Sequence, residues 1–266
     1  METGQPVTLA SHGGDRIDGR TALVTGAGNG LGRAIALALA GAGARVVLTG
    51  RERAKLDVVA EEIGSNRLVA TVDTSAESSV AALAAYLSGE SVSILVNNAG
   101  IAGPVAPLTD ISVADWDEVF AVNVRGVFLM CRTFLPSMVT RGGGDVINIA
   151  SVSGKRPLAR RTPYTASKMA VIGLTTTLAH EVGHLGVTVN SLSPGPVSGP
   201  RMERNFAHEA ARTGTTVEAA EAEFVGRSAL KRMVTEAEVA SAVLAMLAMP
   251  GLTAADIDLS AGMVAR

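Results

Sequence analysis

Short runs rich in β-branched residues alternate with alanine-rich helical segments along this chain, and the alternation limits the folds open to it. Seven such runs occupy residues 21–26, 44–50, 67–73, 93–100, 144–151, 187–195 and 256–260. Strands that alternate with helices form parallel βαβ units, whose crossovers are right-handed. The pattern therefore predicts a single α/β domain, in which a doubly wound sheet of seven parallel strands carries helices on both faces.

Composition excludes several classes of protein. The chain has 266 residues, of which 47% are hydrophobic, and a formal net charge of -2, which suits one domain with a sizeable core. Nucleic acid is not expected as a partner, because phosphate binding needs a strong basic excess or a basic face. The single cysteine, Cys131, lies in the apolar run "VFLMC" without a partner for a disulfide or a metal site. We expect a packed thiol in a reducing compartment and no bound metal.

Two segments, one near each end of the chain, bear on its expected location. Residues 1–17 are polar and lack the apolar segment of a signal peptide, so a flexible leader is expected before a domain spanning residues 18–266. The apolar stretch at 239–255 is broken by Pro250 and Gly251 and is shorter than the roughly 18 residues that suggest a membrane span. We therefore predict a cytoplasmic protein without a membrane partner.

The first predicted strand runs into a glycine-rich loop, "TGAGNGLG" at 25–32. Its glycines have the spacing G-x-x-x-G-x-G, because Arg33 stands where the last glycine of G-x-G-x-x-G would be. Between a strand and a helix, such a loop turns the amides of the helix N-terminus toward a pyrophosphate, although a flexible turn is the alternative. The predicted nucleotide-binding residues of this loop are Gly26, Asn29, Gly30, Leu31 and Gly32.

Residues after the next three strands would meet the rest of a dinucleotide. An acidic residue after the second strand holds the ribose of NAD, and an arginine there accommodates the phosphate of NADP; Gly50 and Arg51 occupy that place. After the third strand, Asp73 either accepts a hydrogen bond from the adenine amine or caps a helix that starts near Ala76. The amides of "NNAG" either support the cofactor or shape a turn. The set therefore also includes Thr74, Asn98, Ala99 and Gly100.

Tyr164 and Lys168, in "TPYTASK", are four residues apart and would share a helix face. They form either a surface pair or a phenol whose proton affinity is adjusted by a cation. A free phenol titrates near pH 10, about 4 kcal/mol from neutrality. One ammonium about 4 Å away contributes roughly the same energy at an effective dielectric constant near 20. Lys168 would therefore be about sufficient to make Tyr164 an acid/base.

The motifs, taken in order, resemble the short-chain dehydrogenase/reductase family in its compact single-domain form. "TGAGNGLG", "NNAG", "AVNVRGVF", Ser151, "YTASK" and "SPGPV" follow the order of that family over about residues 18–262. The resemblance implies a Rossmann-like fold and a catalytic tetrad. Tyr164 would move the proton, Lys168 would also bind the nicotinamide ribose, Ser151 would steady the substrate oxygen and Asn123 would position a water. From the residues alone, Asn123 could be an ordinary helix residue and Ser151 the end of a strand.

The resemblance also assigns the segment after the sixth strand. Pro194 and Gly195 would turn the chain at the nicotinamide, the amide of Val197 would hold its carboxamide, and Ser198 stands where many relatives have threonine. The connection over residues 195–230 is longer than usual and is expected to form a two-helix substrate lid. The basic run at 155–161 could favour an anionic substrate or be a solvated loop; its members are Lys155, Arg156, Arg160 and Arg161.

The expected function is NADP(H)-dependent oxidation or reduction of a small-molecule secondary alcohol or ketone. One alternative is an NAD(H)-dependent dehydrogenase of a polyol, sugar or hydroxy acid, and another is a catalytically silent nucleotide sensor. The helical segments at 116–139 and 164–185 are apolar over more of their circumference than one sheet face can cover. We therefore expect a homo-oligomer, most simply a tetramer.

Overall fold

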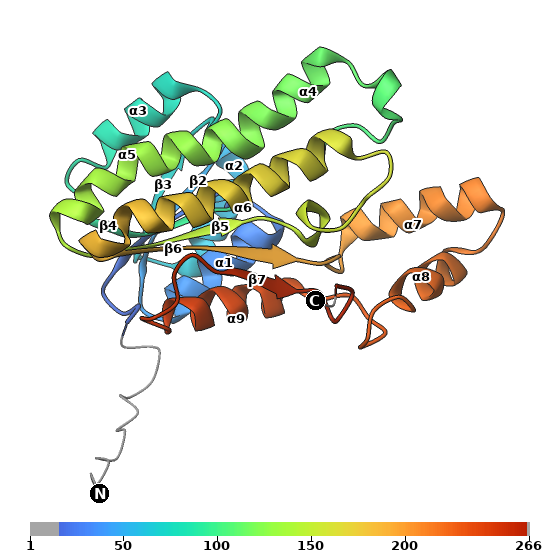
Figure 1. The fold of residues 1–266 in the computed structure, drawn as a ribbon. Helices are drawn as coiled ribbons and strands as arrows, with labels where there is room; N and C mark the ends of the chain where they lie inside the picture. The colour runs from blue at the N-terminus through green and yellow to red at the C-terminus, as the bar shows by residue number, and fades with distance from the viewer. Residues whose placement is uncertain (1–15, 265–266) are drawn as a thin grey trace, which may run out of the picture.

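A computed structural model describes residues 16–264 of the chain and shows the predicted seven-stranded parallel sheet (Figure 1). The spatial order is β3-β2-β1-β4-β5-β6-β7, and every neighbouring pair is parallel. All seven predicted runs form strands. Their bounds are β1 Thr21–Thr25, β2 Arg45–Gly50, β3 Arg67–Thr71, β4 Val92–Asn97, β5 Gly144–Ile149, β6 Val187–Pro194 and β7 Asp256–Leu259.

Helices cover both faces of the sheet because the strands present apolar side chains to both. In β2, Val46 and Leu48 enter one core while Val47 enters the other. The first core is closed by α1 Gly30–Gly41, α2 Arg53–Ile63 and α9 Glu236–Leu247. The second is closed by α3 Glu77–Tyr86, α5 Gly126–Thr140 and α6 Thr162–Val182. The predicted doubly wound single domain is thus confirmed.

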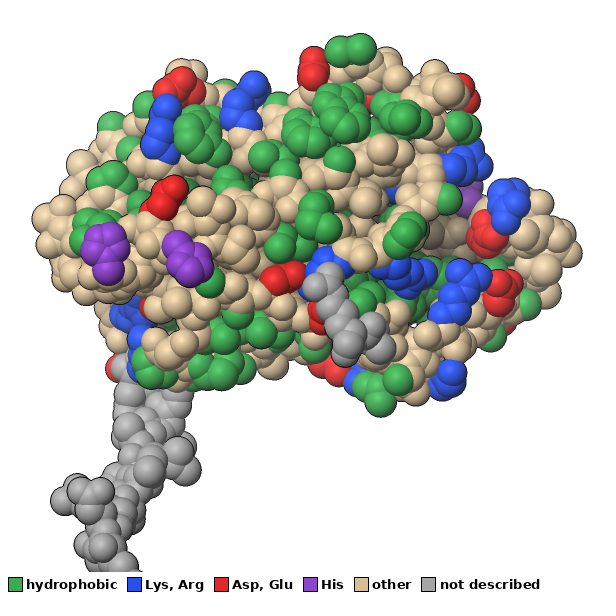
Figure 2. All heavy atoms as spheres, in the orientation of Figure 1, with side chains coloured by type: hydrophobic (Ala, Val, Ile, Leu, Met, Phe, Trp, Pro, Cys, Tyr) green, Lys and Arg blue, Asp and Glu red, His purple; other side chains and the backbone are tan. Residues whose placement is uncertain are grey.

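The longest helical path joins α4 (Val113–Phe120) to α5 through a π-helical segment, Ala121–Arg125. The Ser112 hydroxyl caps its start by accepting a hydrogen bond from the amide of Asp115 at 3.0 Å. By length and composition the helical path Val113–Thr140 could cross a membrane, but half of its most apolar 18-residue stretch is buried inside the protein. Core helices of soluble proteins pass the same test, and Figure 2 shows apolar side chains over α4 and α5 interspersed with charged ones.

The strand order reverses between β1 and β4, and at such a switch point the crevice at the carboxyl ends of the strands is the expected ligand site. Two further helices, α7 Pro200–Thr213 and α8 Val217–Val225, stand beyond this edge of the sheet (Figure 1). They are joined by an edge-to-face contact of Phe206 with Phe224, whose ring centres are 5.5 Å apart. Gly199 and Gly214, which flank α7, have positive φ angles.

Residues 1–15 of the predicted leader lie outside the described residues. Ile17, which was also expected in the leader, belongs to the folded domain, because it is 1% exposed and packs in the core closed by α1 and α9. Arg20 donates a hydrogen bond to the carbonyl of Arg16 at 3.0 Å and so holds this entry segment. The domain therefore begins before residue 18.

Candidate active site

A cleft of about 1610 Å³ is lined by residues at the carboxyl ends of the strands and by residues of α7 and α8. Its walls bring together residues from segments that are far apart in the sequence. Every residue predicted for catalysis or cofactor binding lines this cleft except Asn123, which lies behind the wall.

The glycine loop closes tightly against itself at one end of the cleft. A Cβ on Gly32 would lie 2.1 Å from the carbonyl oxygen of Gly26, and Gly26 has a φ of +67°. Helix α1 begins at Gly30, and the side chain of its N-cap residue, Asn29, makes no capping hydrogen bond. The first amides of α1 are therefore left to the cleft, where they fit the pyrophosphate of a dinucleotide.

"NNAG" serves mainly as a clamp on this loop. Asn98 Nδ2 donates to the carbonyls of Thr25 at 2.9 Å and Gly26 at 3.3 Å. In return, Thr25 Oγ1 accepts hydrogen bonds from the amides of Asn98 and Ala99 at 2.9 and 3.0 Å. These contacts occupy the backbone amides of Asn98 and Ala99, and all three residues from Asn98 to Gly100 line the cleft. Thr25 was missed because it falls inside the first strand.

Asp73 does not cap a helix, so one of its two predicted roles is wrong. Helix α3 begins at Glu77 after the N-cap residue Ala76, whereas Asp73 Oδ1 accepts from the amide and hydroxyl of Ser75 at 2.9 and 2.7 Å. The hydrogen bond from the Ser75 hydroxyl lowers the pKa of Asp73, and the charge of Arg51 lowers it further. Asp73 is therefore a carboxylate at the same end of the cleft as Arg51.

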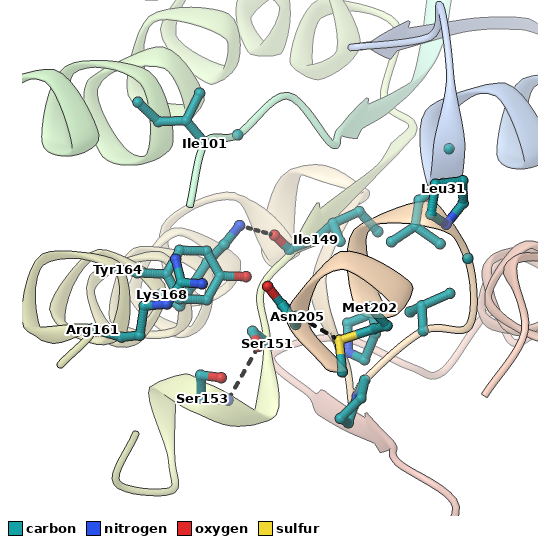
Figure 3. A pocket seen from close by; sticks show the side chains of 18 of the residues that line it. Leu31, Ile101, Ile149, Ser151, Ser153, Arg161, Tyr164, Lys168, Met202 and Asn205 are labelled. Carbon is teal, nitrogen blue, oxygen red and sulfur yellow. Dashed lines mark hydrogen bonds between the residues drawn. The ribbon is translucent and has the colours of Figure 1, made fainter. Parts of the chain in front are cut away.

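Lys168 and Tyr164 lie at the floor of the cleft, in the first turns of α6 (Figure 3). Lys168 is 5% exposed, and its Nζ donates to the carbonyl of Ile149 at 2.8 Å. The same nitrogen is 5.8 Å from the centre of the Tyr164 ring. Ser151 follows β5, and its Oγ accepts a hydrogen bond from the amide of Ser153 at 3.1 Å. A phenol, a buried ammonium and a hydroxyl thus share one corner.

Asn123 holds this corner together from behind. Within the π-helical segment, its Nδ2 donates to the carbonyl of Ile101 at 2.9 Å and to Ser167 Oγ at 3.0 Å, and its Oδ1 accepts from the Ile101 amide at 2.8 Å. Ser167 passes the contact on by donating to the carbonyl of Tyr164 at 2.8 Å. The side-chain amide of Asn123 therefore makes its hydrogen bonds to other protein groups. Ser167, a middle residue of "YTASK", was missed because its neighbours in the motif carried the chemical signal.

The loop after β6 approaches the cleft with its backbone. A Cβ on Gly195 would lie 2.8 Å from the Cα of Ser260, so a side chain does not fit there. Val197 forms an isolated parallel bridge with Val234, made by the Ser198 amide and the Pro196 carbonyl at 2.8 and 3.1 Å. This pattern uses the peptide groups on either side of Val197, so its own amide faces away from the bridge.

Helix α7 adds side chains that no motif indicated. Asn205 Nδ2 lies 3.6 Å from Met202 Sδ, and Figure 3 shows the Asn205 side chain pointing to the same space as Ser151 and the Tyr164 hydroxyl. From the basic run, Arg156, Arg160 and Arg161 line the cleft. Lys155 does not, because its side chain is 4% exposed and pairs with Asp256 and Asp258.

Two further expectations concern sulfur and metals. Cys131 is buried and accepts a hydrogen bond from Asn97 Nδ2 at 3.4 Å, and burial raises the pKa of its thiol to about 12. The predicted packed thiol is confirmed. Within residues 16–264, no three His, Cys, Asp or Glu side chains gather into a group that could hold a metal ion.

Comparison with known proteins identifies the family to which the chain belongs. The sequence model of the short chain dehydrogenase family matches residues 20–211. Galactitol 2-dehydrogenase (L-tagatose-forming) of Cereibacter sphaeroides is 46% identical over 189 residues, which are 69% of this chain and 73% of that protein. D-threitol dehydrogenase of Mycolicibacterium smegmatis is 39% identical over 184 residues, 67% of this chain and 70% of that protein.

A solved structure agrees with the sequence comparisons. A short chain dehydrogenase/reductase family protein superposes with a TM-score of 0.81 at 34% identity, over 93% of this chain and 98% of the other. The fold, the order of motifs and these relatives together leave one assignment: the chain belongs to the short-chain dehydrogenase/reductase family and is an NAD(P)-dependent oxidoreductase.

Proposed function

We propose that this protein transfers hydride between NADP(H) and a secondary alcohol or ketone, with Tyr164 as the acid/base. The observation that carries the proposal is the pairing of Tyr164 with the buried ammonium of Lys168 at the floor of the cleft. A cation held near a phenol in a poorly hydrated place favours the phenolate form. The pair therefore supports proton transfer near neutral pH.

The proposed chemistry needs one proton to move on or off the substrate oxygen. In the oxidising direction Tyr164 takes that proton, and in the reducing direction it gives the proton back. The nicotinamide supplies the hydride acceptor or donor when the cofactor is bound. Ser151 Oγ already accepts from the amide of Ser153, so its own proton is available to donate to the substrate oxygen. Lys168 would also donate to the nicotinamide ribose.

Asn123 enters the proposal as a positioning residue. Its side-chain amide is engaged with Ile101 and Ser167, so the earlier expectation that it positions a relay water receives no support from the side chain. Its hydrogen bonds instead fix the position of the segment after "NNAG" relative to α6, the helix that carries Tyr164 and Lys168.

The preference for NADP(H) is proposed from Gly50 and Arg51. A Cβ on Gly50 would meet Leu56 only at ordinary contact distance, 3.4 Å, and Arg51 is exposed at the cleft. A guanidinium offers a planar fork of donors to a 2′-phosphate. The neighbouring acidic residue, Glu52, already pairs with Lys55 at 2.7 Å and is less suited to hold ribose hydroxyls.

A second candidate is an NAD(H)-dependent polyol dehydrogenase. It is favoured by the relatives, which are named for the oxidation of galactitol and D-threitol. Both candidates use the same proton transfer and differ in nucleotide and substrate. Polyols, hydroxy acids and simple ketones, each tried with both nucleotides while the absorbance of reduced nicotinamide is followed, separate them. Binding of nucleotide without turnover of any substrate would instead support a silent sensor.

Three properties complete the proposal. We place residues 195–230 as a lid over the substrate, because α7 and α8 are joined by their own aromatic contact and flanked by Gly199 and Gly214. We place a tetramer interface on α4, α5 and α6, where Val113 (77% exposed), Phe128 (45%) and Met169 (48%) leave apolar surface in water. A cytoplasmic location fits the unpaired Cys131.

A further inference from the structure

Lys155 is a buried cation that the proposed reaction does not use. Its Nζ lies 2.5 Å from Asp256 Oδ2 and also pairs with Asp258, and its side chain is 4% exposed. Asp256 Oδ1 accepts hydrogen bonds from Ser191 Oγ at 2.9 Å and Ser193 Oγ at 2.7 Å. We call these five residues the Lys155 cluster.

The cluster covers one face of the last two strands. Ser191 is paired in register with Asp256, and Ser193 with Asp258, so the four side chains share a face. The other two residues of β7, Ile257 and Leu259, pack on the opposite face against the core closed by α9. A buried ammonium is costly unless its partners are in place, so the ion pairs determine where the Lys155 side chain lies.

Through its backbone, Lys155 fixes the turn that carries Ser151. The Lys155 amide donates to the carbonyl of Val152 at 3.0 Å, and the Gly154 amide donates to the carbonyl of Ser151 at 2.9 Å. Both bonds belong to the short 3₁₀ turn Val152–Gly154, whose N-cap is Ser151. Displacement of Lys155 would therefore displace the Ser151 hydroxyl.

The carboxylate side of the cluster reaches the other wall of the cleft. Ser193 precedes Pro194 and Gly195, and the Gly195 amide donates to the carbonyl of Leu259 at 2.8 Å, one residue after Asp258. Gly195 also packs closely on Ser260. One ammonium thus ties together the carboxyl ends of β5, β6 and β7; Ser151 follows β5, and the loop at 194–198 follows β6.

We propose that Lys155 is a positioning residue of the reaction: its ion pairs set the separation between Ser151 and the loop at 194–198. This inference rests on the proposed function. A misplacement of about 1 Å in a reacting site can cost about a hundredfold in rate, whereas binding at the distant adenosine end is left intact. Within the basic run, Lys155 therefore joins the two walls of the site, and this role is separate from any charge that the run offers a substrate.

The variant that tests this removes the whole set of charges. Lys155→Met alone leaves two carboxylates facing each other and can fail to fold. The triple variant Lys155→Met/Asp256→Asn/Asp258→Asn leaves no unpaired charge and retains acceptors for Ser191 and Ser193. The matched control is Arg20→Met/Asp145→Asn, which removes an ion pair of 2.7 Å at the opposite, amino-terminal end of the strands, where Thr188 also donates to Asp145.

Wild-type turnover is measured first, since its absence would reject the proposed function before the cluster is tested. The triple variant is then expected to lose about ten- to a hundredfold in kcat, with an altered pH profile of kcat and an NADPH Kd within about twofold of wild type. The control should lose a similar amount of thermal stability but keep kcat within about twofold. A triple variant with wild-type kcat and pH profile, or a control that loses kcat equally, would overturn the inference.

Discussion

Lys168 Nζ lies 5.8 Å from the centre of the Tyr164 ring and is anchored by a hydrogen bond of 2.8 Å to the backbone carbonyl of Ile149. The ammonium is therefore held by β5 as well as by its own helix. This arrangement gives the spacing of four residues in "TPYTASK" a physical meaning, because the cation stays near the phenol and away from water.

Replacing the cation should harm both chemistry and binding. Lys168→Ala removes the charge beside Tyr164 and the proposed contact with the nicotinamide ribose, so we expect kcat to fall at least a hundredfold and the NADPH Kd to rise about tenfold. Steady-state kinetics and fluorescence titration of NADPH check this. Unchanged nucleotide affinity in a folded Lys168→Ala protein would remove the ribose contact from the account.

Nucleotide preference should depend on the corner formed by Gly50 and Arg51. Arg51→Ala removes a charge-assisted contact of roughly 1.5–3 kcal/mol, which predicts about ten- to a hundredfold weaker binding of NADP(H) and little change for NAD(H). Gly50→Asp should invert the preference, since the space beside Leu56 admits a side chain and a carboxylate repels the phosphate. The measurement is kcat/KM with both nucleotides. A wild type that favours NAD(H) would contradict the assignment.

The α7–α8 pair should be more dynamic than the sheet and should close on ligand. These helices share an aromatic contact with each other, and glycines with positive φ flank α7. We expect amides at 200–226 to exchange faster than those of β5 and β6 in the free protein, and to slow when nucleotide and a substrate analogue are added together. Hydrogen exchange followed by mass spectrometry tests this, and equal protection in both states would rule out a closing lid.

Exposed apolar side chains on α5 and α6 should be buried between subunits. Light scattering of the wild type at micromolar concentration should give about four times the 27.1 kDa of one chain. Phe128→Asp/Met169→Asp should give a smaller mass, because a buried unpaired carboxylate is costly. Val58→Asp, on the exposed surface of α2, is the control and should leave the mass unchanged. A monomeric wild type would reject the interface.

The fold and most residues of the cleft could be predicted from the sequence, because both depend on patterns of neighbouring residues. Runs of β-branched residues predict each strand, and the residues that end the strands necessarily meet at one edge of a parallel sheet. Asn98 shows where this reasoning stops: it lines the cleft, but only the structure shows that its side chain donates to the carbonyls of Thr25 and Gly26. Such contacts join segments more than seventy residues apart, and no local pattern records them.

Lys155 and Ile17 illustrate the same limit. In the sequence, Lys155 is one of several cations in a polar run, and its burial depends on two aspartates a hundred residues later. Ile17 is a single apolar residue after a polar leader, and nothing local distinguishes it from a loop residue, yet it fills the core. Asn205 reaches the cleft from a helix without a recognisable motif. Tertiary packing decides these cases.

Whether Tyr164 carries the proton of the reaction is decided by the kcat of Tyr164→Phe. The change removes one hydroxyl and keeps the ring, so the fold and the nucleotide site should be unaffected. With the best substrate of the wild type, we expect kcat to fall at least a hundredfold, as is usual for loss of a positioned acid/base, with an NADPH Kd within about twofold. Retention of more than about a hundredth of the wild-type kcat would contradict the account.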